Sequence, residues 1–320
     1  MNRKATKPLT IVVAILILAI FLPVLVSYPG FKRDMQAAHD RVSRDSKILR
    51  TDKYTIEYSV KGDGIPVLLL HGAGGGYDQG LWAGKTLLGD GYKFISVSRF
   101  GYLNSPIPSG ASIKSQAAAY ATLLDHLNID SVVVVGGSAG GSSAMQFADD
   151  YPDRCQALIL SMAVSMADHS LDDLPVQVRI IHLTQQSDYI YWVFTELLQS
   201  TMLGLMGTAP NTYKKFTPEQ KELAQVMLDD MHPMSRRYAG TFNDDVMIQN
   251  YDLTQNRISV PTLIVHSKDD ALVGHHHANH AHKNIRQSEL VLFEDGGHAM
   301  LSKIYDIRKL TRDFISRKTK

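Results

Sequence analysis

Ser138 lies in the segment 136–140, Gly-Gly-Ser-Ala-Gly, which directly follows four consecutive valines at 132–135. The segment matches the pattern G-x-S-x-G, in which a serine occupies a sharp turn between a strand and a helix. Glycines two residues before and after the serine leave room for this turn, because a Cβ there would collide with the neighbouring strand and helix. The turn holds the hydroxyl at a helix N-terminus, where partial positive charge favours a developing anion. The segment therefore predicts a nucleophilic serine.

Other interpretations of these glycines are weaker. A dinucleotide-binding fingerprint, G-x-G-x-x-G, needs a glycine where Ser138 stands. A phosphate-binding loop needs a lysine, but Gly141 is followed by Ser142 and Ser143. The remaining alternative is a glycine-rich turn without chemistry, so the rest of the chain must decide.

Two later segments supply the groups that a nucleophilic serine needs. A serine hydroxyl becomes reactive when a base accepts its proton and an acid orients that base. Asp269 and Asp270 follow a predicted strand at 262–266, and His298 follows a predicted strand at 289–293 in a Gly-Gly-His turn. When such a triad lies at the ends of successive strands of one parallel sheet, its members follow one another along the chain in the order serine, acid, histidine. We therefore expect a triad that performs acyl transfer.

The elements that position these residues alternate along the chain. Apolar runs typical of buried strands alternate with segments of helical spacing, which predicts an α/β fold: a mostly parallel central sheet with helices on both faces. In such sheets ligands bind outside the carboxyl ends of the strands, and the serine, the acids and the histidine all follow strand ends. Strands are expected at 54–60, 66–70, 93–98, 132–135, 157–161, 262–266 and 289–293.

Residues 166–257 interrupt this alternation. They contain no strand-like run, several helical segments, and seven of the twelve methionines of the chain. We expect a helical insertion over the sheet. Its methionine and aromatic side chains either line an adaptable apolar pocket or simply pack the insertion against the core.

With these motifs in place, the chain resembles the α/β-hydrolase superfamily over about residues 50–318, in the branch of serine hydrolases with a helical lid that includes esterases and haloperoxidases. The resemblance implies a core of residues 48–165 and 258–320, with 166–257 as the lid. It also implies Asp270 as the acid, with Asp269 as the less favoured choice. Two departures from the family pattern lie in the acid's loop, namely Ser267 in place of glycine and Gly274 in place of proline. The resemblance is carried by the segments 71–75 (His-Gly-Ala-Gly-Gly) with Trp82, 99–102 (Arg-Phe-Gly-Tyr), the turn at Ser138, 266–273 (His-Ser-Lys-Asp-Asp-Ala-Leu-Val) and 296–298 (Gly-Gly-His).

Acyl transfer also needs two hydrogen-bond donors for the oxyanion that forms on the attacked carbonyl. One is expected to be the backbone N–H of Ala139, directly after the nucleophile. The other is expected from the loop after His71, with Ala73 as first choice and Gly74 as second. We expect His71 and Arg99 to brace loops near the site rather than to take part in catalysis.

The N-terminus predicts export. Residues 1–8 are basic, residues 9–27 form an apolar run, and residues 28–47 are polar, as in a tether. The run is long for the core of a signal peptide and is followed by a poor cleavage site, so we favour an uncleaved signal anchor over a cleaved signal peptide. The basic flank places residues 1–8 in the cytoplasm and the catalytic domain outside, anchored to the membrane. Cleavage would instead give a secreted or periplasmic protein.

Composition excludes several classes of partner. The net charge is +1 and no basic stripe interleaves with aromatic residues, so we expect no nucleic-acid partner. The single cysteine, Cys155, has no motif around it and is interpreted as a packing residue. No cofactor is expected. One predicted helix carries five histidines: His275, His276, His277, His280 and His282. His276 and His280 would share a face and could bind a metal there, but a solvated surface is favoured over a metal site.

The leading functional hypothesis is a serine hydrolase that cleaves a small or medium, largely apolar carboxylic ester. Ser138 would attack the carbonyl, His298 would transfer the proton and Asp270 would orient the imidazole. The same triad permits hydrolysis of amides, thioesters, lactones or carbon–carbon bonds, or perhydrolysis, and the fold does not choose among them. A membrane-tethered binding protein without catalysis is the alternative from another class.

Overall fold

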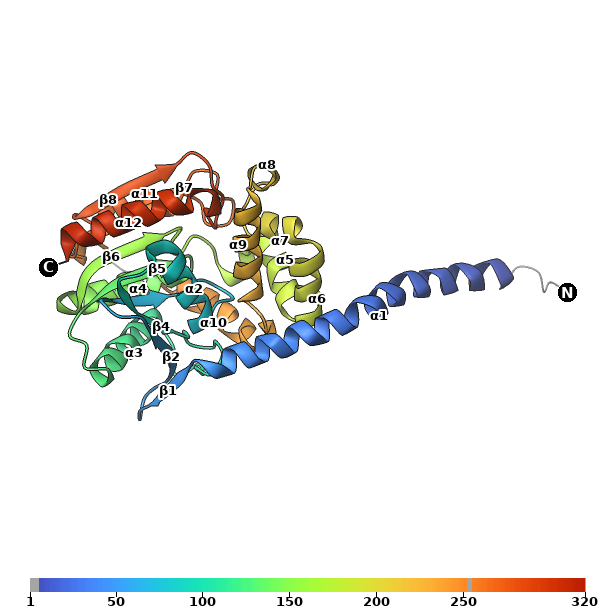
Figure 1. Ribbon diagram of the computed structural model, residues 1–320, viewed down its shortest axis with the longest axis horizontal. Coiled ribbons are helices and arrows are strands. Elements are labelled where there is room, and N and C mark those ends of the chain that lie inside the picture. Colours follow the sequence, from blue (N-terminus) through green and yellow to red (C-terminus); the bar gives the residue numbers. More distant parts are fainter. Residues whose placement is uncertain (1–5, 252–254, 320) are drawn as a thin grey trace.

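The fold is built on one eight-stranded sheet with the order β1-β2-β4-β3-β5-β6-β7-β8 (Figure 1). The computed structural model describes residues 6–251 and 255–319, and within helix α1 it describes side chains from residue 22. β1 and β2 pair antiparallel with their neighbours, and the other strands run parallel to one another. The strands are β1 Lys47–Arg50, β2 Thr55–Lys61, β3 Ile65–Leu70, β4 Tyr92–Val97, β5 Val132–Gly137, β6 Cys155–Ser161, β7 Thr262–Ser267 and β8 Ser288–Phe293.

Helices cover both faces of this sheet, which confirms the predicted α/β class. The valines of β5 show why the strand is apolar throughout, because alternate side chains of a strand point to opposite faces. Val132 and Val134 pack in the core beneath α3, α4 and α11, whereas Val133 and Val135 pack in the core beneath α2 and α12. These helices are α2 Tyr77–Leu88, α3 Ile113–His126, α4 Gly140–Asp150, α11 His276–Asn284 and α12 Ile304–Lys318.

The residues between β6 and β7 form a helical insertion, here defined as residues 166–257. It lies at one end of the sheet, next to α1 (Figure 1). It has a small apolar core of its own, to which Met202, Met227, Met231 and Met234 contribute together with Tyr191. Its helices are α5 Val176–Gln185, α6 Asp188–Trp192, a π-helical turn Val193–Leu197, α7 Gln199–Leu205, α8 Pro210–Lys214, α9 Pro218–Asp229 and α10 Tyr238–Gln249.

The N-terminal segment differs from its prediction. Among the described residues, no helix combines the length and the apolar character needed to span a membrane. The prediction of a signal anchor at 9–27 that holds the catalytic domain at a membrane is therefore wrong, whereas the alternative of a cleaved signal peptide stays a prediction. Residues 1–5 of the predicted basic segment and the side chains of residues 6–21 lie outside the described part of the chain.

The apolar run is instead the first part of a single helix, α1 Thr6–Arg44, whose far end projects away from the rest of the chain (Figure 1). The helix continues through the expected tether, and there Met35, Ala38 and Val42 are buried. These positions recur at helical spacing, so one face of α1 packs against the folded body.

Candidate active site

Ser138 forms the corner between β5 and α4. Its φ is +49°, a left-handed conformation that is rare for a residue with a side chain and costs on the order of 1–3 kcal/mol. Backbone hydrogen bonds hold the corner, since the N–H of Ser138 donates to the carbonyl of Ser161 at 3.1 Å and its carbonyl accepts from Val164 N–H at 2.9 Å. A Cβ on Gly140 would lie 2.4 Å from the carbonyl oxygen of Leu70, so only glycine permits this close approach.

The structure brings Ser138, His298 and Asp270 into one hydrogen-bonded chain. Nε2 of His298 lies 3.0 Å from Oγ of Ser138, and Nδ1 of His298 lies 2.8 Å from Oδ2 of Asp270. A carboxylate can only accept, so the ring proton is on Nδ1 and the lone pair of Nε2 faces the serine hydroxyl. This arrangement lets His298 accept the proton of Ser138.

Asp270 is a buried carboxylate with four partners. Its Oδ1 accepts from the N–H groups of Leu272 at 2.9 Å and Val273 at 3.0 Å, and its Oδ2 also accepts from Nε2 of His266 at 3.1 Å. Burial raises the pKa of Asp270, but the two imidazoles of His298 and His266 outweigh it, so that the pKa lies well below its usual value. The carboxylate therefore stays ionised and can stabilise a protonated His298.

Asp269, the less favoured acid, makes different contacts. Its Oδ1 accepts from the N–H of Gly297 at 2.8 Å, and its Oδ2 accepts from the hydroxyl of Thr212 at 3.2 Å. Asp269 thus fixes the loop that carries His298 and links it to the helical insertion.

Further hydrogen bonds brace the loop that carries His298. Ser267, a departure from the family pattern, donates its hydroxyl to the carbonyl of Gly297 at 2.7 Å. The carbonyl of Gly207, in the insertion, accepts from the N–H groups of His298 at 3.3 Å and Ala271 at 3.4 Å. The acid and base loops are thus tied to one point of the insertion.

The two backbone N–H groups predicted as oxyanion donors lie near Ser138. Ala139 follows Ser138 at the start of α4, and Ala73 lines the same cavity as Ser138. Within the described parts of the chain, neither N–H has a hydrogen-bond acceptor. The N–H of Gly74, the second choice, already donates to Oγ1 of Thr241 at 3.1 Å, which favours Ala73.

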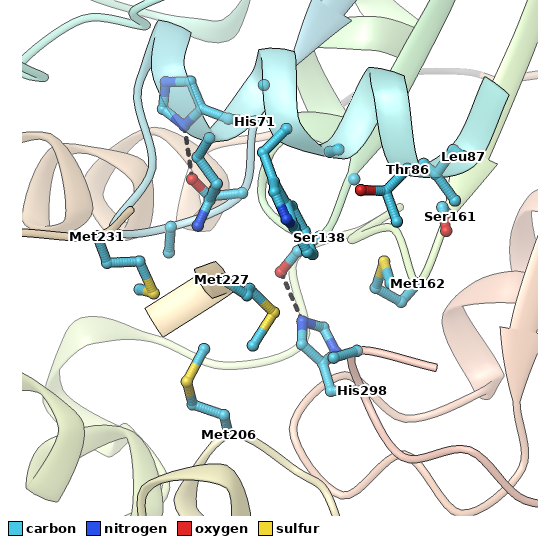
Figure 2. Close-up of a pocket in the computed structure, with 18 of the residues that line it drawn as sticks. His71, Thr86, Leu87, Ser138, Ser161, Met162, Met206, Met227, Met231 and His298 are labelled. Carbon is cyan, nitrogen blue, oxygen red and sulfur yellow. Dashed lines mark hydrogen bonds between the residues drawn. The ribbon is translucent and has the colours of Figure 1, made fainter. Parts of the chain in front are cut away.

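An apolar cavity of about 180 Å³ opens on one side of Ser138. Figure 2 shows Met162, Met206, Met227 and Met231 around Ser138 and His298. We call this cavity the methionine pocket. Met202, Met227 and Met231 also belong to the core of the insertion, so these side chains both pack the insertion and line the cavity.

A second cavity of about 120 Å³ also borders Ser138. It shares Ala73, Ser138, Ile181, Gln185 and Leu272 with the methionine pocket. Most of the rest of its wall comes from the loop after β6, helix α5, helix α10 and the start of α11, with Ala139 and Val273 completing it. We call this cavity the polar pocket, because five titratable side chains line it: Asp168, His169, His182, Asp245 and His277.

Comparison with known proteins places this site in a family. A family model described as "alpha/beta hydrolase fold" matches residues 65–302. An uncharacterized hydrolase, YcgS of Bacillus subtilis, is 30% identical over 267 residues, which cover 80% of this chain and 93% of the relative. The chain belongs to the α/β-hydrolase fold family.

Other similar proteins illustrate the range of this hydrolase family. A solved esterase from Exiguobacterium antarcticum is 25% identical with a TM-score of 0.63, and the match covers 85% of this chain and 98% of the esterase. The 2-hydroxy-6-oxo-2,4-heptadienoate hydrolase of Pseudomonas putida is 26% identical over 266 residues, which cover 80% of this chain and 90% of that enzyme. The predicted superfamily is thus confirmed, and this α/β hydrolase has relatives with different substrates.

In this α/β hydrolase, the side chains of His71 and Arg99 make hydrogen bonds that brace the loops near the site. Nδ1 of His71 donates to the carbonyl of Gly72 at 2.7 Å, and Nε2 accepts from the N–H of Arg99 at 3.1 Å. Burial and the charge of Arg99 hold the pKa of His71 well below its usual value. The guanidinium of Arg99 makes two hydrogen bonds of 2.6 Å with the carboxylate of Asp244 in α10, which fastens the insertion to the core.

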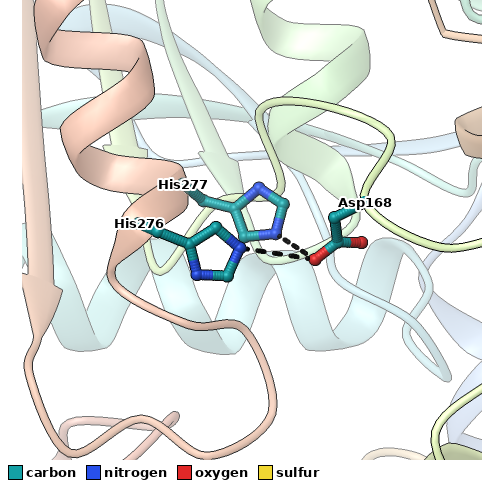
Figure 3. Close-up of side chains that lie close together, drawn as sticks. All are labelled: Asp168, His276 and His277. Atoms are coloured by element: carbon teal, nitrogen blue, oxygen red, sulfur yellow. Dashed lines mark hydrogen bonds and ion pairs between the residues drawn. The ribbon is translucent and has the colours of Figure 1, made fainter.

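The histidines of α11 form a different group from the pair His276 and His280 that their spacing in the sequence suggests. His276 and His277, not His280, meet Asp168, with Nε2 of His277 at 3.0 Å and Nε2 of His276 at 3.5 Å from its Oδ2 (Figure 3). Nδ1 of His277 accepts from the N–H of Ser165, so Nε2 carries the ring proton and donates it to Asp168. A metal at Nε2 would have to displace that proton, which favours a hydrogen-bonded hub over a metal site.

Several residues at the site carry no motif in the sequence. His266 stands four residues before Asp270 in the chain, and this spacing is the one signal in the sequence for their contact. Gly207, Gln185 and Asp245 lie in the insertion, and no spacing relates them to the triad. Only the folded chain reveals their proximity.

Proposed function

We propose that this α/β hydrolase cleaves carboxylic esters with an apolar arm through Ser138, His298 and Asp270. The observation that carries the proposal is the hydrogen-bonded chain from Ser138 through His298 to an ionised Asp270. The similarity to the esterase from Exiguobacterium antarcticum supports an ester as the substrate.

In the proposed reaction, Oγ of Ser138 attacks the carbonyl carbon while its proton moves to Nε2 of His298. The N–H groups of Ala139 and Ala73 would stabilise the oxyanion, and each such donor is typically worth about 10²–10³ in rate. The intermediate collapses to an acyl-enzyme as His298 protonates the leaving alcohol. Water then attacks with His298 again as base, which releases the acid and restores the serine.

The methionine pocket would hold the apolar arm of the substrate. Unbranched thioether side chains adapt to differently shaped apolar groups, which favours a range of chain lengths. Because the insertion supplies Met202, Met206, Met227 and Met231 to the wall, we propose that residues 166–257 act as the lid of the site.

The test compares the wild-type protein with Ser138→Ala on p-nitrophenyl butyrate. Hydrolysis should fall by about 10⁵-fold or more, to the rate set by the remaining groups. A fluorophosphonate probe should label Ser138 in the wild type, as located by peptide mass spectrometry, and should leave the variant unlabelled. Ser109→Ala, the same change at an exposed serine, is the matched control and should keep both properties. Full activity in Ser138→Ala, or labelling elsewhere, would refute the assignment.

A second candidate is hydrolysis of a carbon–carbon bond in a vinylogous keto acid. The similar heptadienoate hydrolase of Pseudomonas putida favours it. Synthetic dienoate substrates, followed by loss of their visible absorbance, separate this activity from ester cleavage. The candidate with the higher kcat/KM is the one retained.

A further inference from the structure

The two cavities that meet at Ser138 differ in which groups of the site they contain. His298 lines the methionine pocket and not the polar pocket, whereas Ala139 lines the polar pocket and not the methionine pocket. Ala73 lines both cavities. A substrate attacked by Ser138 can therefore place one arm beside the base and the other arm beside the predicted oxyanion donors.

The chemistry of acyl transfer decides which arm lies beside the base. In the tetrahedral intermediate the attacked carbon carries Oγ of Ser138, the oxyanion, the acyl carbon and the oxygen of the alcohol. Nε2 of His298, 3.0 Å from Oγ, takes the serine proton and then gives it to the alcohol oxygen. That oxygen must therefore come within hydrogen-bond distance of Nε2, and the alcohol arm begins on the side of the site that His298 occupies.

The oxyanion donors fix the direction of the other arm. With the oxyanion at the N–H of Ala139 and the alcohol oxygen at His298, the acyl carbon is turned away from the imidazole. The polar pocket lies there, because its wall contains Ala139 and no atom of His298. Its volume is about 120 Å³ against about 180 Å³ for the methionine pocket, so the acyl arm has less room than the alcohol arm.

The wall of the methionine pocket suits an apolar alcohol. Ala299, Leu301 and Ile304, which follow His298 in the chain, line it together with Trp82 of α2. The described wall of this cavity contains no lysine, arginine or carboxylate. A leaving part that carries a carboxylate would lose its water there without a cationic partner, which counts against the vinylogous keto acid as a substrate.

We propose that the methionine pocket holds the alcohol arm of the ester and the polar pocket holds the acyl arm. The proposal rests on the proposed esterase function and adds a substrate class to it: esters of a long apolar alcohol with a short acid. Ala83 lines the methionine pocket alone and Val178 lines the polar pocket alone, so each determines specificity for one arm.

The first test measures kcat/KM for two series of esters that both start at ethyl acetate. One series lengthens the alcohol up to octyl acetate, and the other lengthens the acid up to the isomer ethyl octanoate. We expect kcat/KM to rise about 100-fold or more along the alcohol series, because each further methylene is buried, and less than about tenfold along the acid series. An equal or larger rise along the acid series would overturn the proposal and leave the esterase function intact. Absence of hydrolysis in both series would overturn the esterase function as well.

The second test uses Val178→Phe, which places an aromatic ring in the wall of the polar pocket. This variant should lower kcat/KM for ethyl octanoate about tenfold or more, while octyl acetate changes less than about threefold. The ratio of the two values does not depend on how much of the variant is folded, because both esters are measured on one sample. Val226→Phe, the same change at an exposed valine of α9, is the matched control and should leave the ratio unchanged. A larger loss for octyl acetate in Val178→Phe would overturn the proposal.

A third measurement locates the two arms directly. The Ser138→Ala protein cannot form an acyl-enzyme, so a crystal structure with octyl acetate can show the intact ester. We expect the octyl chain beside Ala83 and Leu301 and the acetyl group beside Ala139. An octyl chain in the polar pocket would overturn the assignment of the arms, whereas the esterase function is judged by turnover alone.

Discussion

The two pockets that meet at Ser138 differ in what their walls can recognise. The methionine pocket offers flexible apolar side chains, and the polar pocket adds two carboxylates and three imidazoles to apolar side chains of its own. One methylene more or less in an apolar pocket changes binding by only about 1–3 kcal/mol, whereas an apolar group beside polar wall groups also displaces their water at a cost. We expect the methionine pocket to accept alcohols of many lengths and the polar pocket to restrict the acid.

Among changes that keep the nucleophile, the largest effect should come from Asp270, which serves substrates in both pockets equally. In Asp270→Asn the side-chain amide can donate toward Nδ1 of His298, which moves the ring proton to Nε2 and removes the base for Ser138. We expect kcat to fall about 10⁴-fold for every ester, whichever pocket it favours. Steady-state kinetics on octyl acetate and on ethyl octanoate check this equality.

Asp269→Asn is the matched control for that experiment. Its Oδ1 can still accept from the N–H of Gly297, so the loop of His298 should stay in place and kcat should change less than about tenfold. A larger loss in Asp269→Asn than in Asp270→Asn would exchange the two roles.

The next effect concerns how the wall of the polar pocket is fastened to the core. Arg99→Met would leave the carboxylate of Asp244 buried without its ion-pair partner, since the two side chains are 1% and 2% exposed. Removing one partner of a buried pair typically costs about 3–5 kcal/mol of unfolding free energy. Urea titration measures it, and Lys309→Met, which breaks an exposed pair with Asp313, should leave the midpoint unchanged.

A smaller effect should distinguish the methionine pocket from its neighbour. Ala83 lines the methionine pocket and not the polar pocket, so Ala83→Phe should fill the former alone. We expect kcat/KM for octyl acetate to fall about 10–100-fold while ethyl acetate keeps its rate. Equal losses for both chain lengths would show that the apolar arm lies elsewhere.

The smallest effect should be on folding stability and should come from Glu196 in the insertion. Burial, the hydrogen bond with Asp229 and the charges of Asp229 and Asp34 raise the pKa of Glu196 to about 7. The folded chain therefore binds this proton more tightly than the unfolded chain, and its contribution to stability is lost as pH rises from about 4.5 to about 7.

Glu196→Gln should for this reason raise Tm by about 1–2 °C at pH 8 and leave it unchanged near pH 4.5, a modest change because Glu196 is only partly buried. Differential scanning calorimetry at the two pH values measures the difference. Glu222→Gln, at an exposed position of α9, should shift Tm equally little at both. A lower Tm for Glu196→Gln at pH 8 would contradict the assigned cause.

The sequence predicts the central sheet well because buried parallel strands are apolar on both faces. It misses β1, in which only Leu49 is buried, since a four-residue edge strand has no pattern to detect. It also interprets residues 28–47 as a tether, although Met35, Ala38 and Val42 show the spacing of a helix face. The apolar run at 9–27 favours a membrane anchor followed by a linker, and that interpretation obscures the helical spacing.

The site divides in a similar way. Ser138, the acids and His298 follow strand ends, so their order along the chain predicts that they lie together, and the structure brings them within hydrogen-bond distance. Their catalytic roles stay predictions until they are tested. Gln185 and Asp245 of the polar pocket lie on helices of the insertion, where a polar residue near a cavity has the same pattern as one facing solvent. Only tertiary packing distinguishes the two.

Helix α1 has a consequence for how the protein can be shortened. Arg41 near its end reaches the carbonyl of His232 at 2.8 Å, and further along, Asp34 accepts from Nε1 of Trp192 at 3.0 Å. Phe31 packs edge-on against the ring of Tyr189 at 5.2 Å. Trimming the chain to residue 46 would remove these partners and expose the rings of Tyr189 and Trp192 in α6, which favours aggregation. Recombinant work should begin upstream of Phe31.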